Sequence, residues 1–272
     1  MKELSLREIQ LRELDLLIQF DSFCKKHDLK YSLCSGTLLG AIRHKGFIPW
    51  DDDIDVQMPR KYYDKLIEIM ETSNDLHVQG YGIRHASLSE APFVRVQDVN
   101  TLIKHEVLNN DKDLHLYIDI LPIDGFPDDE IKREIIMRKR DILKKCIKWS
   151  NVRLGTAHST KAEILRFPAV ILCKAIGSDY FAKKWGKLAR RIDFESCFEG
   201  AVIGGNFYRT KECMPRKEWY DQVEVEFEGH LFWSMGCWKL HLERLYGDYM
   251  ILPPKEKRIP QHRIRIYDSR ID

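Results

Sequence analysis

Two aspartates one residue apart, Asp53 and Asp55, alternate with Ile54 and Val56. In a β-strand, alternate side chains share a face, so both carboxylates are expected to line a cleft while the apolar pair enters the core. Their Cα atoms would lie about 6.5 to 7 Å apart, a separation from which both side chains can reach one magnesium ion. The pattern therefore predicts part of a metal site.

A third carboxylate has the same setting, because Asp119 stands between two isoleucines. A neighbouring strand is expected to bring it to the same cleft. Asp51 shares the parity of Asp53 and Asp55 and remains an open candidate for the metal. Magnesium usually keeps coordination positions for water and substrate phosphates, so three carboxylates with open positions predict a phosphate-bearing ligand.

A turn of small residues, Ser35, Gly36 and Thr37, precedes the acidic segment by about sixteen residues and provides a phosphate-binding candidate. Glycine lets the backbone approach a phosphate, and the amides at a helix N-terminus can receive the anion. Arg43 and His44 follow and are expected to neutralise phosphate charge, although a surface position for the histidine is the alternative. Metal and phosphate groups are thus expected on adjacent elements.

The hydrophobic pattern predicts the elements that position these residues. Apolar residues at helical spacing over 5–27 predict an amphipathic helix, with Ser5 and Glu8 forming a capping box at its start. The remaining pattern predicts, in chain order, a strand at 30–34, a helix at 38–43, a strand at 53–58, a helix at 60–71, a strand at 116–121, an extended stretch at 223–232 and a helix at 238–245.

A strongly charged helical pattern follows from 128 to about 193, and we interpret residues 128–200 as a helical insertion. The chain of 272 residues is 44% hydrophobic, enough for a substantial core. We therefore predict one catalytic domain over 1–272, of the α/β (α+β) class. In it, a mixed sheet carries the aspartates and helices cover the other face.

Composition excludes several classes of function. The formal net charge is +2, from 44 basic and 42 acidic residues, so no global field indicates nucleic-acid binding. Seven cysteines form an odd set with no C-x-x-C pair, which fits neither a disulfide framework nor a zinc site. The start of the chain lacks a signal-peptide pattern, and the uncharged stretch 167–173 is too short to cross a bilayer. We expect a cytoplasmic protein with at most peripheral membrane contact.

Simpler explanations of the acidic residues fit the sequence less well. A solvated surface run is disfavoured because Ile54 and Val56 require burial at alternate positions. An EF-hand loop starting at Asp51 would need glycine at its sixth place and glutamate at its twelfth, where Val56 and Tyr62 stand. Asp124, two residues after a proline, is expected to cap a turn.

The residues from Ser35 to His44 and from Phe47 to Asp55 together resemble the signature of the LicD family. The segments 117–127 and 245–254 are similar to further parts of that family, whereas 223–245 departs from its usual pattern. The resemblance implies a nucleotidyltransferase-type fold with a catalytic aspartate triad, related to the fukutin-type transferases. It also implies a magnesium cofactor, with manganese as the alternative.

The activity implied is a phosphotransferase reaction. Phosphocholine, or a related phosphoalcohol, would pass from CDP-choline or a similar CDP-alcohol to a hydroxyl of a cell-surface glycan or a lipid-linked saccharide. Lipopolysaccharide and teichoic-acid-type precursors are such acceptors, and CMP would leave. Two alternatives stay open: a nucleotidyltransferase that places a nucleotide on a sugar or protein, and a non-catalytic glycan-binding protein.

The resemblance also suggests residue roles. The catalytic acids would be Asp53, Asp55 and Asp119, with the small-residue turn around Gly36 at the phosphates. Arg95 is similar to a family position and is expected to contact phosphate. A basic tail follows the last family-like segment, and three of its residues are expected to close over the donor: Lys257, Arg258 and His262.

Overall fold

The computed structural model describes residues 1–72, 93–105, 114–152, 154–155, 159–205, 209–259 and 264–270. Its centre is a mixed sheet with the strand order β1-β10-β4-β5-β3-β2-β9-β8, to which β6 and β7 are attached through β5. The strands are β1 (Lys2–Glu3), β2 (Ser32–Leu33), β3 (Asp55–Pro59), β4 (Val94–His105), β5 (Leu114–Phe126), β6 (Glu199–Ala201), β7 (Met214–Pro215), β8 (Val223–Phe227), β9 (His230–Ser234) and β10 (Ile264–Asp268).

The sheet is mixed because β3 pairs with β5, and β2 with β9, in parallel, whereas the other strand pairs are antiparallel. The expected α/β class with a mixed sheet is therefore confirmed. The apolar residues that alternate with the aspartates form its core, since Ile54, Val56, Ile118 and Ile120 are at most 1% exposed. The period-two pattern thus placed these side chains on the correct face.

The helices are α1 (Leu6–Lys26), α2 (Ser35–His44), α3 (Arg60–Thr72), α4 (Glu130–Asn151), α5 (Thr160–Ile176), α6 (Ser178–Ala189), α7 (Arg216–Tyr220) and α8 (Trp238–Tyr246), with 3₁₀ turns η2 (Phe194–Ser196), η3 (Arg209–Glu212) and η4 (Lys255–Lys257). The predicted capping box of α1 is confirmed, because the Ser5 side chain accepts from the Glu8 N–H and the Glu8 side chain accepts from the Ser5 N–H. This helix packs on β4 and β5.

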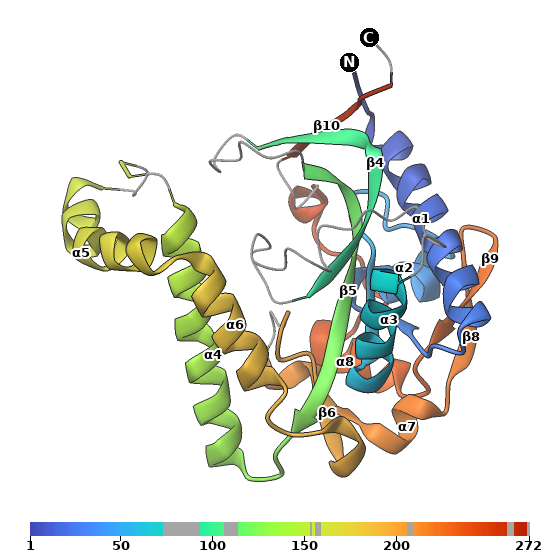
Figure 1. Cartoon of the computed structure of the whole chain (residues 1–272). Helices are drawn as coiled ribbons and strands as arrows, with labels where there is room; N and C mark the ends of the chain where they lie inside the picture. The colour runs from blue at the N-terminus through green and yellow to red at the C-terminus, as the bar shows by residue number, and fades with distance from the viewer. Residues whose placement is uncertain are drawn as a thin grey trace.

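The helices α4, α5 and α6 form what we call the helical arm, which lies to one side of the sheet in Figure 1. In the arm, α4 packs against both α5 and α6. The first helix of the arm, α4, follows β5 directly. The Asp129 side chain caps α4 by accepting from the Lys132 N–H. The helices expected in this part of the chain are present, and its division from the rest as an insertion stays a prediction.

Several expected boundaries are wrong: the extended stretch 223–232, for example, is the antiparallel pair β8 and β9, and three further differences bear on the site. The small residues 35–37 belong to α2, which starts at Ser35 with a φ of 48°. The acidic strand starts at Asp55, so Asp53 lies in the preceding loop. β5 continues past Pro122 to Phe126. Proline is tolerated there because β4 pairs with β5 only as far as Ile120, which leaves residue 122 without a partner on that side in the described register.

Candidate active site

Three neighbouring strands place Arg95, Asp119 and Asp55 in one row. Asp55 of β3 is the register partner of Asp119 of β5, which in turn is the partner of Arg95 of β4. Adjacent strands lie about 4.8 Å apart, so the two carboxylates are close neighbours across the parallel pair. The Asp119 N–H donates to the Ile54 carbonyl at 2.9 Å and fixes the register just before β3 begins.

The loop before β3 brings further carboxylates together. One oxygen from each of Asp51, Asp52 and Asp53 lies within 4.8 Å of the others, and among the described residues this is the acidic group that converges so closely. It differs from the predicted trio, because Asp55 and Asp119 come from the adjoining strands. Gln10 of α1 holds the loop by donating from Nε2 to the Asp51 carbonyl at 2.9 Å.

The electrostatics of the cluster favour a cation. Burial raises the pKa of the Asp55 carboxyl well above its usual value, and Asp53, Asp119 and Asp51 raise it further. The pKa of Glu13, a fully buried carboxyl of α1, is raised by burial and then by the charges of the same group. Such crowded carboxylates are the oxygen donors that magnesium prefers, so the residues present fit that ion.

The start of α2 lies against this cluster. A Cβ built on Gly36 would meet the Asp51 Oδ2 at 2.7 Å, so the glycine allows the carboxylate to approach the helix terminus. The Thr37 hydroxyl accepts from the Asp55 N–H at 2.9 Å, and the Ser35 N–H donates to the His241 Nε2 at 3.2 Å. The predicted turn residues are thus beside the predicted acids, with Thr37 positioning β3.

Arg95 contacts a carboxylate of the site. Its Nε donates to the Asp119 Oδ1 at 2.8 Å, and its guanidinium lies 3.9 Å from the centre of the Tyr117 ring. Side-chain exposures of 19% and 20% leave both members of the ion pair accessible to a ligand. The contact with phosphate that the sequence suggested stays a prediction.

A cavity of about 540 Å³ opens next to the acidic loop and joins three segments that are far apart in the sequence. Gly36 and Arg43 line it from α2, and Trp50 and Asp51 from the acidic loop. The end of α8 and the segment after it supply most of the remaining wall, which includes Tyr246, Asp248, Tyr249, Leu252, Pro253 and Lys257. Its volume is in the range of pockets for small ligands and cofactors.

The basic residues around this cavity are held in place. Arg43 donates from Nε to the His44 Nε2 at 3.0 Å and from one terminal nitrogen to the Tyr249 carbonyl at 2.7 Å. Burial, and then the charge of Arg43, lower the pKa of His44. The Arg258 guanidinium lies over the Trp50 ring at 5.6 Å. Lys257 lines the cavity, while His262 lies outside the described residues.

Three buried residues near the site were missed by the sequence interpretation: Glu13, Glu212 and His241. The first has an Oε2 without a hydrogen-bond partner among the described residues. Glu212 and His241 line a small buried space together with Ser35 and Asp55. For Glu13 a signal existed, since it stands four residues from both Ile9 and Leu17 on the apolar side of α1.

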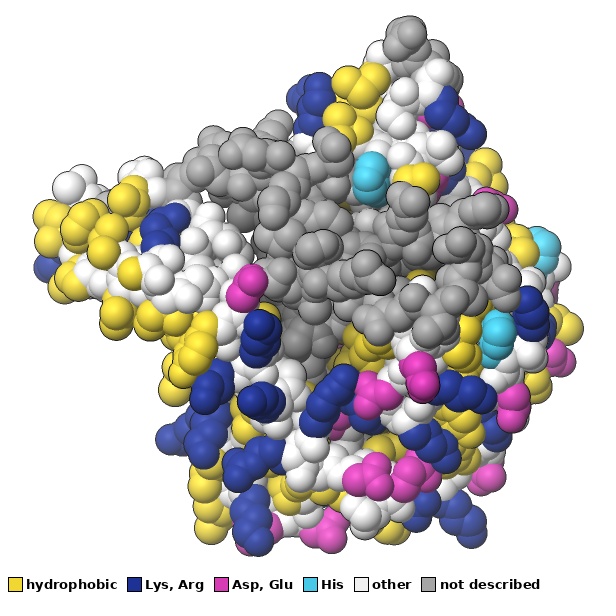
Figure 2. Space-filling view, in the orientation of Figure 1, with side chains coloured by type: hydrophobic (Ala, Val, Ile, Leu, Met, Phe, Trp, Pro, Cys, Tyr) yellow, Lys and Arg dark blue, Asp and Glu magenta, His cyan; other side chains and the backbone are white. Residues whose placement is uncertain are grey.

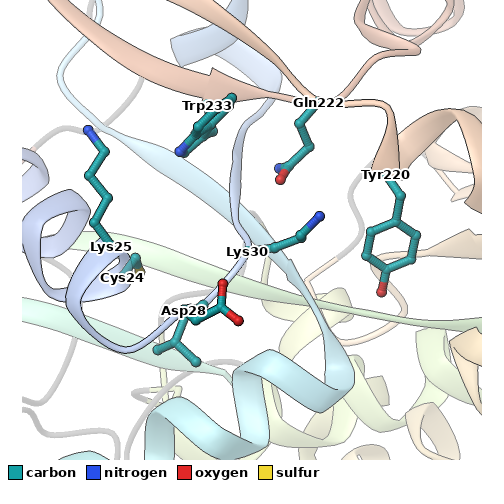
Figure 3. A pocket seen from close by; sticks show the side chains of 8 residues that line it. Cys24, Lys25, Asp28, Lys30, Tyr220, Gln222 and Trp233 are labelled. Carbon is teal, nitrogen blue, oxygen red and sulfur yellow. The ribbon is translucent and has the colours of Figure 1, made fainter.

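A second cavity, of about 380 Å³, is shown in Figure 3. Lys30, Tyr220, Gln222 and Trp233 line it, and the Lys30 Nζ lies 5.6 Å from the centre of the Tyr220 ring. Leu29 and Lys30 precede β2, whereas α2 and its contacts with the acidic cluster follow that strand. The predicted catalytic aspartates do not line this cavity, so we take the first one as the candidate donor site.

Comparison with known proteins shows which family the chain resembles. Residues 28–149 match the family described as "LicD/FKTN/FKRP, nucleotidyltransferase domain". Over 276 aligned residues the chain is 33% identical to the lipopolysaccharide cholinephosphotransferase LicD of Haemophilus influenzae, covering 96% of this chain and 97% of that protein. Two uncharacterized rickettsial proteins, from Rickettsia typhi and Rickettsia prowazekii, are 34% and 30% identical over 39% and 38% of this chain, covering 32% and 35% of their own lengths.

Proposed function

We propose that the protein moves phosphocholine from a CDP-linked donor to a hydroxyl of a lipopolysaccharide or related glycan precursor. The basis is its family, because the chain belongs to the LicD family and is a transferase of that type. CMP is the leaving group. The observation that carries the proposal is the meeting of four separate segments in one site. Gly36, Asp51 and Tyr249 surround the cavity, and Asp119 pairs with the strand that follows the acidic loop.

Asp53, Asp55 and Asp119, with Asp51 beside them, are the residues that would hold magnesium, or manganese in its place. When bound, the ion supplies positive charge that stabilises the transferred phosphate and the departing nucleotide. The raised pKa values of Asp55 and Glu13 support this assignment, since both arise from burial and from crowded negative charge. A bound cation would offset that repulsion.

Different residues of the cavity would bind different parts of the donor, and the first part is its diphosphate. Gly36, at the start of α2, lies against Asp51, so donor phosphates bound there would meet both the helix N-terminus and a metal ligand. Arg43 and Lys257 line the same cavity and add positive charge for the diphosphate. The cavity is thus assigned to the donor rather than to the acceptor.

The trimethylammonium group is assigned to the aromatic wall. Tyr246 and Tyr249 line one cavity with the acidic residue Asp248, a combination suited to a quaternary ammonium. Each contact of such a cation with an aromatic face contributes about 0.5 to 2 kcal/mol. The alternative is that these rings hold the cytosine, and the experiment below separates the two.

In the reaction, the acceptor oxygen forms a bond to the phosphorus of phosphocholine while the bond from that phosphorus to the bridging oxygen of CMP breaks. The attack is in line, as in other phosphoryl transfers. The acceptor proton passes to a carboxylate of the site, Asp119 or Asp51, which acts as general base. The products are the phosphocholine-bearing glycan and CMP.

The direct test is to incubate the protein with magnesium, choline-labelled CDP-choline and lipopolysaccharide that lacks phosphocholine. The expected result is transfer of the choline label with stoichiometric release of CMP. Pyrophosphate release from CTP, with the nucleotide attached to the acceptor, would instead support the nucleotidyltransferase alternative. Absence of both products with every acceptor tried would leave a glycan-binding protein.

The donor assignment is tested by calorimetry with CDP-choline, CDP-glycerol and CMP. Asp248→Asn and Tyr249→Leu are expected to weaken CDP-choline by about tenfold, because a contact worth roughly 1.4 kcal/mol is lost, and to leave the other two ligands unchanged. Equally weakened binding of all three ligands would indicate that the aromatic wall binds the nucleoside. Leu11→Asn, an exposed position of α1, serves as the control variant.

A further inference from the structure

The outer side of α5 exposes large apolar side chains. Ile164, Leu165 and Leu172 are 69%, 75% and 61% exposed. At 100° per residue, these three share one side of the helix with Pro168, Ile171 and Ile176. The opposite side packs into the arm through Val170 and Cys173, which are buried. The helix is therefore apolar on both sides, and one side has no covering element among the described residues.

The helical arm is also strongly basic. Residues 130–189 contain 15 lysines and arginines against 5 aspartates and glutamates, an excess of ten positive charges. The whole chain has a net charge of +2, so the remainder is acidic by eight charges. Figure 2 shows hydrophobic side chains gathered over α5 and lysine and arginine side chains over the arm below it. Five lysines of α5 and α6 are exposed: Lys161, Lys174, Lys183, Lys184 and Lys187.

Aromatic residues lie beside two lysines of the arm, one on α6 and one on α4. The Lys184 Nζ lies 5.4 Å from the centre of the Tyr180 ring, and the Lys145 Nζ lies 4.5 Å from that of Trp149. Tyr180 is itself 50% exposed, at the start of α6 next to the end of α5. Amphipathic rings beside basic groups are typical of proteins that lie at a lipid–water boundary.

Among the described residues, no helix is long and apolar enough to span a bilayer. With 17 residues, α5 is about 26 Å long at 1.5 Å per residue, and Lys161 and Lys174 interrupt it near both ends. The helix is suited to lie along a surface. An anionic bilayer offers hydrocarbon and negative charge in one plane, which matches both the exposed side of α5 and the basic excess of the arm.

We propose that the exposed side of α5 binds the surface of an anionic lipid bilayer, with Leu165 and Leu172 among the acyl chains and the lysines of α5 and α6 at the phosphate headgroups. This surface is separate from the donor cavity, whose walls come from other elements. The inference is independent of which group the enzyme transfers. If the acceptor is lipid-linked, binding to the same bilayer raises its effective concentration at the enzyme.

The experiment is cosedimentation of the full chain with vesicles of phosphatidylcholine alone or mixed with phosphatidylglycerol. The wild type is expected to bind the anionic vesicles and to be released by added salt. Leu165→Asn with Leu172→Asn is expected to lower partitioning about a hundredfold, the effect of losing roughly 1.4 kcal/mol at each leucine. Changing Lys183, Lys184 and Lys187 together to glutamine is expected to lower it about tenfold or more.

A matched control replaces Leu11 and Leu231 by asparagine, since these leucines are 48% and 55% exposed on α1 and β9. This pair is expected to bind vesicles as the wild type does, and CDP-choline binding is expected to be unchanged in all variants. Equal losses in the control, or no binding of the wild type to anionic vesicles, would overturn the proposal. So would sedimentation analysis showing a wild-type dimer that Leu165→Asn with Leu172→Asn dissociates without any vesicle effect.

Discussion

The two halves of β5 each hold an aspartate that is ion-paired with an arginine, and the two pairs differ in their surroundings. Asp119 accepts from the Arg95 Nε at 2.8 Å, and both side chains are about one-fifth exposed. Asp124, five residues later, accepts from two nitrogens of Arg60 at 2.7 Å each and is 1% exposed. One strand therefore carries an accessible pair and a sealed pair.

Their charge environments differ as well. Asp119 adjoins Asp55, whose pKa it helps to raise together with Asp53 and Asp51. At Asp124, burial raises the carboxyl pKa, and the hydrogen bonds and positive charge of Arg60 act against that rise. A bidentate pair of this kind satisfies its own charge. The cluster at Asp119 keeps an excess of negative charge, which is the condition for binding a cation.

The comparison teaches that an aspartate–arginine contact alone does not identify a functional carboxylate. Accessibility and the number of like charges nearby distinguish the two. We therefore expect Asp124 to contribute to stability, and we propose Asp119 for the chemistry. Substitutions at each end of the strand should separate turnover from folding.

The largest effect is expected at Asp119, at the end of β5 that adjoins the candidate active site. Asp119→Asn should lower turnover by about a thousandfold, because charge that stabilises the transition state would be lost through the metal. Its melting temperature should be unchanged or raised, since one of several repelling carboxylates is removed. CMP release and a thermal melt measure the two quantities. Asp128→Asn, at an exposed position after the same strand, is the control that keeps wild-type turnover.

The opposite result is expected at Asp124, which forms the buried ion pair with Arg60. Asp124→Asn leaves the Arg60 charge buried with a weaker partner, and the free energy of unfolding should fall by about 3 to 5 kcal/mol. Asp64→Asn serves as the matched control, because this carboxylate is 49% exposed and also contacts Arg60, at 3.9 Å. Its cost should stay below about 1 kcal/mol. Equal costs for the two variants, measured by urea denaturation, would remove the distinction drawn along β5.

Magnesium should stabilise the protein by binding the carboxylates around Asp55 and Asp119, and Asp124 should have no part in this effect. At a free concentration of about a hundred times its Kd, a ligand that binds only the folded state adds about 2.7 kcal/mol to the free energy of unfolding. Wild type and Asp124→Asn should both gain this stability over a chelator-treated sample, whereas Asp53→Asn and Asp55→Asn should gain little. Manganese is the second ion to test. Identical melting curves with chelator and with either ion would contradict a metal site at these carboxylates.

Local patterns in the sequence were sufficient to predict part of this arrangement. The alternation around Asp55 and Asp119 predicted which side chains leave the core, and the capping box predicted where α1 starts. The strand pairing that makes these two residues neighbours depends on contacts between distant segments, which no local pattern contains. The expectation that Asp124 caps a turn is wrong, because its partner Arg60 is 64 residues away.

The helical residues of the site show the same limit. Glu13, Glu212 and His241 lie on α1, η3 and α8, and each reaches the site only through the tertiary fold. A histidine in an amphipathic helix gives no sign that it will accept a hydrogen bond from the start of another helix. In the structure, the His241 Nε2 accepts from the Ser35 N–H, and its Nδ1 has no hydrogen-bond partner among the described residues.

The smallest effect is expected from His241, which lines a small buried space together with Ser35 and Asp55. Burial, and then the charge of Arg244, lower the pKa of His241 to about 4 from an ordinary value of 6.5. As the pH falls below 6.5, the unfolded chain therefore binds a proton that the folded protein does not, and stability decreases toward pH 4. Between about pH 7 and about pH 5 this amounts to roughly 2 kcal/mol.

The measurement is urea denaturation of wild type and His241→Gln over that pH range. Glutamine retains a side-chain acceptor for the Ser35 N–H but does not titrate, so the variant should lack this part of the acid destabilisation. Carboxyls with raised pKa values, such as Asp55 and Glu13, change stability with the opposite sign and are present in both proteins, so the difference between the two curves isolates the histidine. Parallel curves would mean that His241 becomes protonated in the folded protein near its ordinary pKa. The Ser35 N–H would then lose its acceptor, and the assignment of a neutral His241 next to the acidic cluster would be wrong.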